Sequence, residues 1–344
     1  MNMQQDTNLT INQEFNNSVV NSSNLVNLDT YFHGQKAYDM KNFFEIRGQI
    51  LFLPDLISNY VVHEKFAKKI TYYEYRAINY PGHGNSLVQP NLQFEGIVNL
   101  VCEYIKENNL DELTIIGHGF GALVAAAVAA QMKGNINKLI FVSPLTLASF
   151  RSVNDYKRLV LPLDLQSLCL SQSYKFANYQ ELVQYNDYQK DLVSELNYLI
   201  RNKANFENLY EEVYNIGFLH QVEEKYYQAI GDIPLLLILG ANSKFTAVNE
   251  DVEFFDNNFL KVKSLIMKNA GYLPFLEQPG RYYLNVVNFL NDDQYTYPKP
   301  EKNRTFTDDQ LLNEANLLES DLDHNQKKQL GFWRRLLQKI FKLK

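Results

Sequence analysis

Cysteine and concentrated positive charge are scarce in this chain of 344 residues. The 2 cysteines, Cys102 and Cys169, are too few for a disulfide framework or a cysteine-based metal cluster, so we expect no metal site and a reducing, cytoplasmic environment. The chain has 33 basic and 39 acidic residues, and the basic ones are pooled only at the C-terminal end. The net charge of −6 argues against a nucleic-acid-binding surface on the body of the protein.

Long apolar runs are also lacking. The longest, 122–130, is about half the roughly 20 residues that a bilayer-spanning helix needs. No apolar block surrounds the first basic residue, Lys36, so we expect no secretory signal. Residues 1–38 are polar with few aliphatic side chains, and too little apolar surface is present to offset the entropy of ordering. This segment is predicted to be disordered.

Residues 39–144 and 232–292 have the pattern of alternating strands and helices. Short apolar runs rich in β-branched and aromatic residues are separated by segments whose apolar residues recur every three or four positions. The pattern predicts an α/β fold with a mostly parallel, doubly wound sheet. The expected strands are 43–53, 71–78, 113–116, 138–142, 233–239 and 259–267, and the expected helices are 92–106, 120–132 and 281–290.

The alternation stops between residues 145 and 231, where leucine and tyrosine recur at helical spacing. Leu182, Tyr185, Leu192 and Leu196 are examples. We expect a helical lid here, inserted late into the α/β domain. Its many tyrosines are expected to pack between lid and body rather than to bind a ligand, because amphipathic aromatic side chains commonly pack with one wet edge.

The C-terminal part changes character again. Residues 293–305 form a proline-containing linker, and Thr307 to Gln310 resembles a capping box that opens an acidic helix within 306–344. The last segment, 326–344, combines basic residues with apolar ones at helical spacing, which is typical of a helix lying on an anionic membrane surface. The candidate membrane contacts are Lys327, Lys328, Phe332, Trp333, Arg334, Arg335, Ile340 and Phe341. Alternatively, this basic helix packs on the acidic helix, on the body or on a protein partner.

Two glycine-containing motifs carry the chemical argument. In the first, an apolar strand runs through Gly117, His118, Gly119, Phe120 and Gly121 into an alanine-rich helix. This strand, tight turn and helix have the context of a nucleophile elbow, in which small flanking residues allow the two backbones to approach. The second motif, the turn Pro81-Gly82-His83-Gly84, also follows a predicted strand and contains backbone that favours positive φ.

Together with 233–246 and 268–279, these motifs resemble the α/β-hydrolase superfamily, in its esterase- and lipase-like branch with a helical cap. The resemblance covers about residues 43–291. It implies an α/β-hydrolase fold, with the lid between the sixth and seventh strands as that family counts them. It also implies a serine nucleophile, an acid and a histidine base.

Carried over position by position, the triad falls on Gly119, Ser243 and Tyr272, none of which has the required chemistry. The equivalents of the oxyanion region are Asp55, Leu56 and Phe120, where a carboxylate at Asp55 would repel a developing oxyanion. Gly117, Gly121, His118 and the turn 81–84, including His83, are expected to be scaffold. Loss of the serine or histidine costs about a millionfold in turnover, or about 8 kcal/mol of transition-state stabilisation.

We therefore expect a non-catalytic pseudoenzyme with a degenerate triad and no cofactor. It would bind a small apolar or lipid ligand or a protein partner, in the cytoplasm, with peripheral attachment to the inner membrane face through 326–344. The alternative is a carboxylic-ester hydrolase, or another enzyme of the same fold, with a rearranged site built from Asp55, His118, Tyr272 or a neighbouring serine. A purely structural role, with the pocket filled by its own side chains, is a third reading.

Overall fold

The structure is a computed structural model that describes residues 28–33 and 47–291, except 57, 90, 155, 163, 180–196, 198, 199, 201 and 205. Within these residues, seven strands form one sheet in the order β1-β3-β2-β4-β5-β6-β7. Strand β1 pairs antiparallel with β3, and all the other pairs are parallel. The strands are β1 (Thr30–His33), β2 (Gln49–Leu53), β3 (Glu74–Ile78), β4 (Leu113–His118), β5 (Ile136–Val142), β6 (Leu235–Gly240) and β7 (Val262–Met267).

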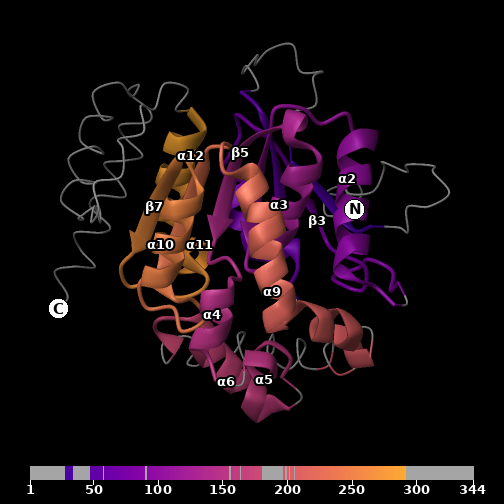
Figure 1. Ribbon diagram of the computed structural model, residues 1–344, viewed down its shortest axis with the longest axis vertical. Helices are drawn as coiled ribbons and strands as arrows, with labels where there is room; N and C mark the ends of the chain where they lie inside the picture. Colours follow the sequence, from indigo (N-terminus) through magenta and orange to yellow (C-terminus); the bar gives the residue numbers. More distant parts are fainter. Residues whose placement is uncertain are drawn as a thin grey trace, which may run out of the picture.

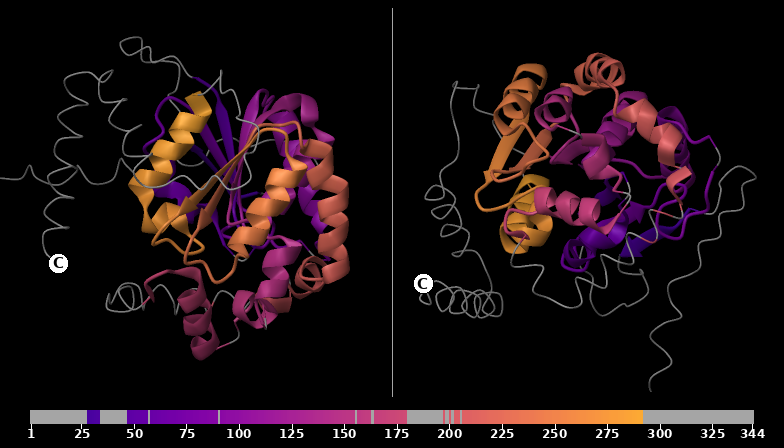
Figure 2. Two further views of the ribbon diagram at one scale, coloured as in Figure 1. Left: turned by 60° about the vertical axis from the view of Figure 1, so that its left-hand side comes forward. Right: turned by 90° about the horizontal axis from the view of Figure 1, so that it is seen from below.

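Helices cover both faces of this sheet (Figures 1 and 2). One face is covered by α2 (Phe94–Glu107), α3 (Phe120–Gln131) and α10 (Val248–Asn258). The other carries α12 (Pro279–Asn291), which contacts both α1 (Glu64–Ala67) and α11 (Pro274–Glu277). All residues of the central strands β4 and β6 are buried, as expected for parallel strands between two helical layers. The predicted α/β class is confirmed.

The described part of the chain between β5 and β6 consists of short helices joined by turns and loops. Its helices are α4 (Leu147–Ser152), α5 (Tyr156–Val160), α6 (Leu165–Lys175) and α9 (Ile216–Val222), followed by a π-helical turn (Glu223–Tyr227) and a 3-10 turn (Gln228–Ile230). Helices α4, α5 and α6 gather beyond one end of the sheet (Figure 1). The insertion follows the fifth strand of this sheet rather than a sixth, because a single strand, β1, precedes β2 and β3 in the described residues.

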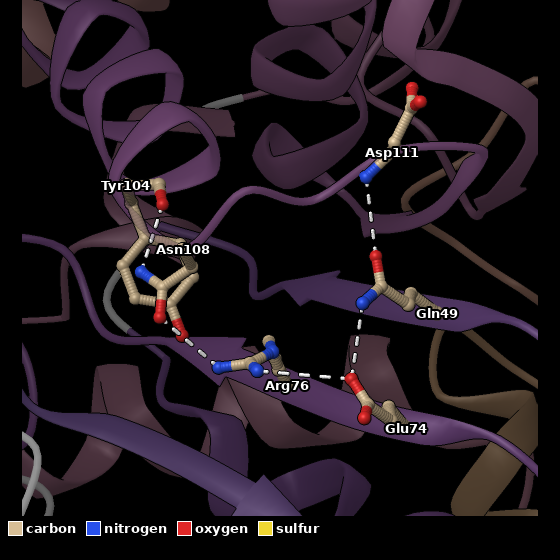
Figure 3. A network of polar contacts seen from close by, with 6 residues as sticks. All are labelled: Gln49, Glu74, Arg76, Tyr104, Asn108 and Asp111. Carbon is tan, nitrogen blue, oxygen red and sulfur yellow. Dashed lines mark hydrogen bonds and ion pairs between the residues drawn. The ribbon is translucent and has the colours of Figure 1, made fainter. Parts of the chain in front are cut away.

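A polar network at the amino ends of the strands joins helix α2 to the sheet (Figure 3). At the start of β2, the Gln49 amide nitrogen donates to Glu74 at 3.1 Å, and its oxygen accepts from the Asp111 backbone N–H at 3.2 Å. The Arg76 guanidinium lies 3.8 Å from Glu74 and donates to Asn108, the C-cap of α2, at 3.2 Å. These contacts fix the loop that leads into β4.

The predicted disorder of residues 1–38 is wrong for the segment that forms β1. Tyr31 is buried against the core, and the carboxylate of Asp29 accepts hydrogen bonds from Tyr60, Asn79 and the backbone of Asn85. One buried ring and one well-paired carboxylate hold a strand of four residues. The predicted linker, acidic helix and basic helix, 293–344, lie outside the described residues.

The predicted strands are found, with shifted ends. Strand β2 begins at Gln49, and the first part of the predicted strand, 43–46, lies outside the described residues. Strand β3 begins at Glu74 because residues 71–73 form a turn. Strand β4 continues to His118, two positions beyond the prediction, because its pairing with β5 extends to the His118–Val142 pair. No helix among the described residues is both long and apolar enough to cross a membrane.

Candidate active site

The turn between β4 and α3 has the backbone expected of an elbow. Gly119 adopts φ +54° and ψ −117°, a conformation that side-chain-bearing residues rarely tolerate. A Cβ on Gly121 would overlap the carbonyl oxygen of Leu53, so the start of α3 approaches the end of β2 closely. The strand, turn and helix therefore meet as the sequence motif predicts.

The side chain of Asp55 points into this elbow. Its Oδ1 atom accepts hydrogen bonds from the backbone N–H of Phe120 at 2.7 Å and of Leu56 at 2.9 Å. Its Oδ2 atom accepts a bond from the hydroxyl of Tyr272 at 2.9 Å. The residue is 8% exposed. A buried carboxylate thus occupies the two backbone donors that the resemblance assigns to the oxyanion.

This arrangement differs from the expected one. From the sequence, Asp55 stands beside the oxyanion donors as a repelling charge, whereas in the structure it is their hydrogen-bond partner. The signal that sequence reasoning missed is chemical: aspartate side chains commonly accept hydrogen bonds from nearby backbone N–H groups in turns. The contact with the N–H of Leu56, its immediate neighbour, is of this kind.

Two of the three triad-equivalent positions lie together. A Cβ placed on Gly119 would overlap both the Tyr272 hydroxyl and the Asp55 carboxylate, so these groups fill the space into which an elbow side chain would project. Ser243 belongs to the turn after β6, where its hydroxyl accepts a hydrogen bond from the N–H of Phe245 at 3.3 Å and its own N–H donates to Gly240. The structure therefore assembles Asp55, Gly119 and Tyr272, with Ser243 engaged in its own turn.

The buried histidines near the elbow are held in structural contacts. His118 has its Nε2 atom 3.1 Å from the carbonyl oxygen of Tyr272, and its ring packs on the rings of Tyr272 and Phe275. Burial lowers the pKa of His118 from its ordinary value, with the Asp55 charge acting in the opposite sense. The ring is therefore neutral near pH 7 and donates from Nε2 to the only acceptor in that contact, a carbonyl.

Asn79, two residues before the turn 81–84, is held by two hydrogen bonds. Its amide donates to Asp29 at 2.8 Å and its oxygen accepts from the N–H of Tyr60 at 2.9 Å. Gly82 and Gly84 have φ of +77° and +54°. His83 places its Nδ1 atom 3.1 Å from the carbonyl of Pro81, and burial lowers the pKa of His83 to about 4. His83 therefore contacts the turn to which it belongs.

Aromatic rings from the insertion pack over the elbow. The ring of Tyr156 in α5 lies 5.3 Å from those of Tyr214 and Phe245, and Phe245 lies 5.1 Å from Tyr272. Tyr210 stacks on Tyr214 at 4.4 Å. Burial raises the pKa of each of these tyrosines, and the Asp55 charge raises it further. A closely packed layer of neutral phenols thus surrounds the carboxylate.

Among the residues that the structure describes, no group of three or more histidine, cysteine, aspartate or glutamate side chains is placed to hold a metal ion. The candidate membrane contacts, Lys327 to Phe341, lie outside the described residues. The site therefore consists of one carboxylate, two backbone donors and a phenol.

A sequence model described as alpha/beta hydrolase fold matches residues 58–279. The chain belongs to the α/β-hydrolase fold family. "Putative esterase/lipase 2" of Mycoplasma pneumoniae is 29% identical over 255 residues, which cover 72% of this chain and 90% of that protein. The protein of the same name in Mycoplasma genitalium is 27% identical over 273 residues, covering 77% of this chain and 96% of that protein. At the level of the family, this α/β-hydrolase chain is therefore esterase- and lipase-like.

Solved structures agree on the fold. A putative lipase from Acinetobacter baumannii superposes with a TM-score of 0.60 at 18% identity, covering 76% of this chain and 91% of that one. MGS-M2, an α/β-hydrolase enzyme from a deep-sea metagenome library, superposes with a TM-score of 0.61 at 15% identity, covering 78% and 97%. At these identities the likeness concerns the fold, and the predicted α/β-hydrolase fold is confirmed.

Proposed function

We propose that this α/β-hydrolase is a non-catalytic member of its family whose role is binding. The observation that carries the proposal is the hydrogen bonding of Asp55, whose Oδ1 atom accepts from both Phe120 and Leu56. In a working esterase, two such N–H groups stabilise the negative oxygen of the tetrahedral intermediate. Here they are already satisfied by a fixed negative charge.

The magnitudes support the proposal. Loss of one oxyanion donor costs about 10²–10³-fold in turnover, and here Asp55 engages both. An oxyanion forming nearby would also meet a like charge in a buried site, where the repulsion is only weakly screened. The absence of a serine at Gly119 by itself lowers turnover by about a millionfold. Any one of these effects reduces hydrolysis severely.

The alternative function is that of a carboxylic-ester hydrolase with a rearranged site. It is favoured by the names of the Mycoplasma relatives, which this chain matches over 90% and 96% of their lengths. Such an enzyme needs a nucleophile. The hydroxyl that lies nearest to the elbow position Gly119 is that of Tyr272, and it donates a hydrogen bond to Asp55. Burial and the Asp55 charge both raise the pKa of Tyr272, so its nucleophilic phenolate is disfavoured near pH 7. The geometry therefore argues against a tyrosine nucleophile at this site.

The proposal includes the remaining sequence predictions that concern function. The ligand is a small apolar or lipid molecule or a protein partner, bound beneath or on the helical lid 145–231. The protein acts in the cytoplasm, and the segment 326–344 holds it at the anionic inner face of a membrane. These assignments rest on the sequence patterns: the tyrosine-rich lid and the basic, amphipathic C-terminus.

The decisive experiment is hydrolysis of p-nitrophenyl esters, from acetyl to palmitoyl, by the full-length protein. The controls are a triad-intact esterase and the Tyr272→Phe variant, purified in the same way. We expect no turnover above background for either form of this protein. Turnover that follows the protein through purification and is lost in Tyr272→Phe would overturn the proposal and establish a rearranged active site.

A further inference from the structure

A fully buried carboxylate fastens the first helix of the insertion to the core. Asp251 lies in α10, and its Oδ1 atom accepts a hydrogen bond from the hydroxyl of Thr146 at 2.5 Å. Its Oδ2 atom accepts a bond from the hydroxyl of Ser149 at 2.7 Å. Thr146 is the N-cap of α4, and its hydroxyl oxygen accepts from the N–H of Ser149 at 3.0 Å. Both oxygens of Asp251 thus hold the first turn of α4.

A second carboxylate holds the same turn from another element. Glu223 begins the π-helical turn that follows α9, and its Oε1 atom accepts from the N–H of Leu147 at 2.7 Å. The hydroxyl of Ser149 also accepts from the N–H of Ala247, in the loop after β6, at 3.0 Å. The first turn of α4, where the insertion begins, is therefore bound to Glu223 near the end of the insertion, and also to Asp251 and Ala247 outside it.

The donors to Asp251 are neutral, and its charged neighbours are mostly acidic. Glu223 and Glu250 both raise the pKa of Asp251, while burial raises it most, to about 7, against the opposing hydrogen bonds of Thr146 and Ser149. The pKa of Glu223 is raised too, by burial, while the hydrogen bond from the N–H of Leu147 and the charges of His220 and Arg151 oppose that rise.

The remaining titratable neighbours are two tyrosines. The charge of Asp251 adds to burial in raising the pKa of Tyr227 and Tyr156, so both phenols stay neutral near pH 7. Neutral phenols contribute no compensating positive charge. The carboxylate therefore faces two carboxylates, two hydroxyls and two phenols.

The protonation state of Asp251 decides how these hydrogen bonds are arranged. The ionised carboxylate can accept from both hydroxyls at once, but it is a buried negative charge beside other carboxylates. The neutral acid avoids that charge and keeps both contacts with α4: its O–H donates to one hydroxyl oxygen, and its other oxygen accepts from the second hydroxyl. A released Asp251, in water, returns to its ordinary range of about 4.

We propose that Asp251 is a pH-sensitive latch for the insertion: the attached state of α4 holds a proton on Asp251, and detachment of α4 releases that proton to water. Detachment is therefore favoured as the pH rises from about 4 to about 7, by up to tenfold per pH unit, and levels off above that range. Helix α4 leads into α5, whose Tyr156 packs over the elbow, so detachment of α4 loosens the aromatic layer above Asp55.

The test is hydrogen exchange of the full-length protein at pH 5.5 and 8.0, observed at the backbone amides of Leu147, Ser149 and Phe150. Each variant is compared with the unmodified protein at the same pH, so that the chemical exchange rate cancels. Asp251→Asn mimics the neutral acid. Glu253→Gln, an exposed residue of the same helix α10, is the matched control.

Hydrogen exchange gives the opening constant, which is the equilibrium constant for detachment of α4. The ratio of this constant in the unmodified protein to that in Asp251→Asn is expected to rise by about thirtyfold between pH 5.5 and 8.0. Glu253→Gln is expected to follow the unmodified protein. An unchanged ratio at the two pH values overturns the proposal, even if Asp251→Asn is destabilised at both.

If Asp251→Asn does not fold, Glu223→Gln replaces it, since glutamine keeps an acceptor for the N–H of Leu147 and removes a neighbouring charge. The opening transition must then move to lower pH, and an unmoved transition overturns the proposal. Neither readout depends on a ligand or on activity, so it is separate from the proposed function.

Discussion

Restoring a serine at the elbow is expected to damage the fold without restoring hydrolysis. In Gly119→Ser, the new Cβ would overlap the hydroxyl of Tyr272 and the carboxylate of Asp55. One of these two groups must move, which breaks the 2.9 Å hydrogen bond between them. Since no base lies where Tyr272 stands, no esterase activity is expected to accompany the serine.

The cost has two parts. A residue with a side chain held at φ +54° and ψ −117° is strained by about 1–3 kcal/mol. Loss of a buried hydrogen bond to a carboxylate costs about 1.5–3 kcal/mol more. We therefore expect Gly119→Ser to lower the free energy of unfolding by about 2.5–6 kcal/mol, a large part of the 5–15 kcal/mol typical of a folded domain.

Urea unfolding, followed by circular dichroism, measures this loss. The matched control is Gly134→Ser, because a Cβ on Gly134 meets no atom within 4 Å and its φ is not positive. The control is expected to change stability by less than about 0.5 kcal/mol. The double variant Asp55→Gly, Gly119→Ser should lose less stability than the two single variants together. The difference in the free energy of unfolding should be at least about 1 kcal/mol, since the overlap with Asp55 is removed.

The reasoning would be refuted by a loss below about 1 kcal/mol in Gly119→Ser, or by strictly additive effects in the double variant. Either result would mean that Asp55 and Tyr272 do not fill the space at the elbow. Esterase activity in Gly119→Ser alone would refute the functional part, because it would require a base that the proposal excludes.

Two further predictions concern the carboxylate at the elbow and the C-terminal segment. Asp55→Gly should leave the N–H groups of Leu56 and Phe120 without their partner. Acetate should then bind there in place of the lost carboxylate and raise the melting temperature of this variant in a saturable way, whereas chloride at equal ionic strength should not. If acetate raised the melting temperature of the unmodified protein equally, it would not be binding at the place of Asp55. Deletion of 326–344 should abolish binding to anionic liposomes in a sedimentation assay and leave the melting temperature nearly unchanged, and a large fall in melting temperature would instead make this segment part of the fold.

The positions of the parallel strands along the chain and the elbow could be predicted from sequence because both depend on local patterns. Strands such as β4 and β6 are continuous apolar runs, and Gly117, Gly119 and Gly121 mark a place where two backbones meet. Strand β1 escaped prediction because its four residues carry one buried ring, and its stability depends on contacts with Asn79 and Tyr60 far along the chain.

The contacts of the site itself could not be read from local patterns. Asp55 meets Phe120 and Tyr272 across 65 and 217 positions, and Asp251 meets Thr146 across 105. Which of its neighbours a carboxylate accepts from is decided by the fold, not by the spacing of residues. The sequence identified Asp55, Gly119 and Tyr272 as chemically unusual, and only the structure assigns Asp55 to both backbone donors.

The two changes at the elbow are energetically consistent with each other. An empty oxyanion site keeps two N–H groups directed at a space that is filled only during the reaction, and each buried donor left without a partner costs about 1–3 kcal/mol. Asp55 satisfies both donors, and the hydroxyl of Tyr272 satisfies its second oxygen, so the carboxylate is buried with three hydrogen bonds. Glycine at 119 is then required twice: it relieves the strained backbone, and it leaves room for the carboxylate. The proposed loss of catalysis would therefore go together with a gain in stability, the usual direction of the trade-off between activity and stability.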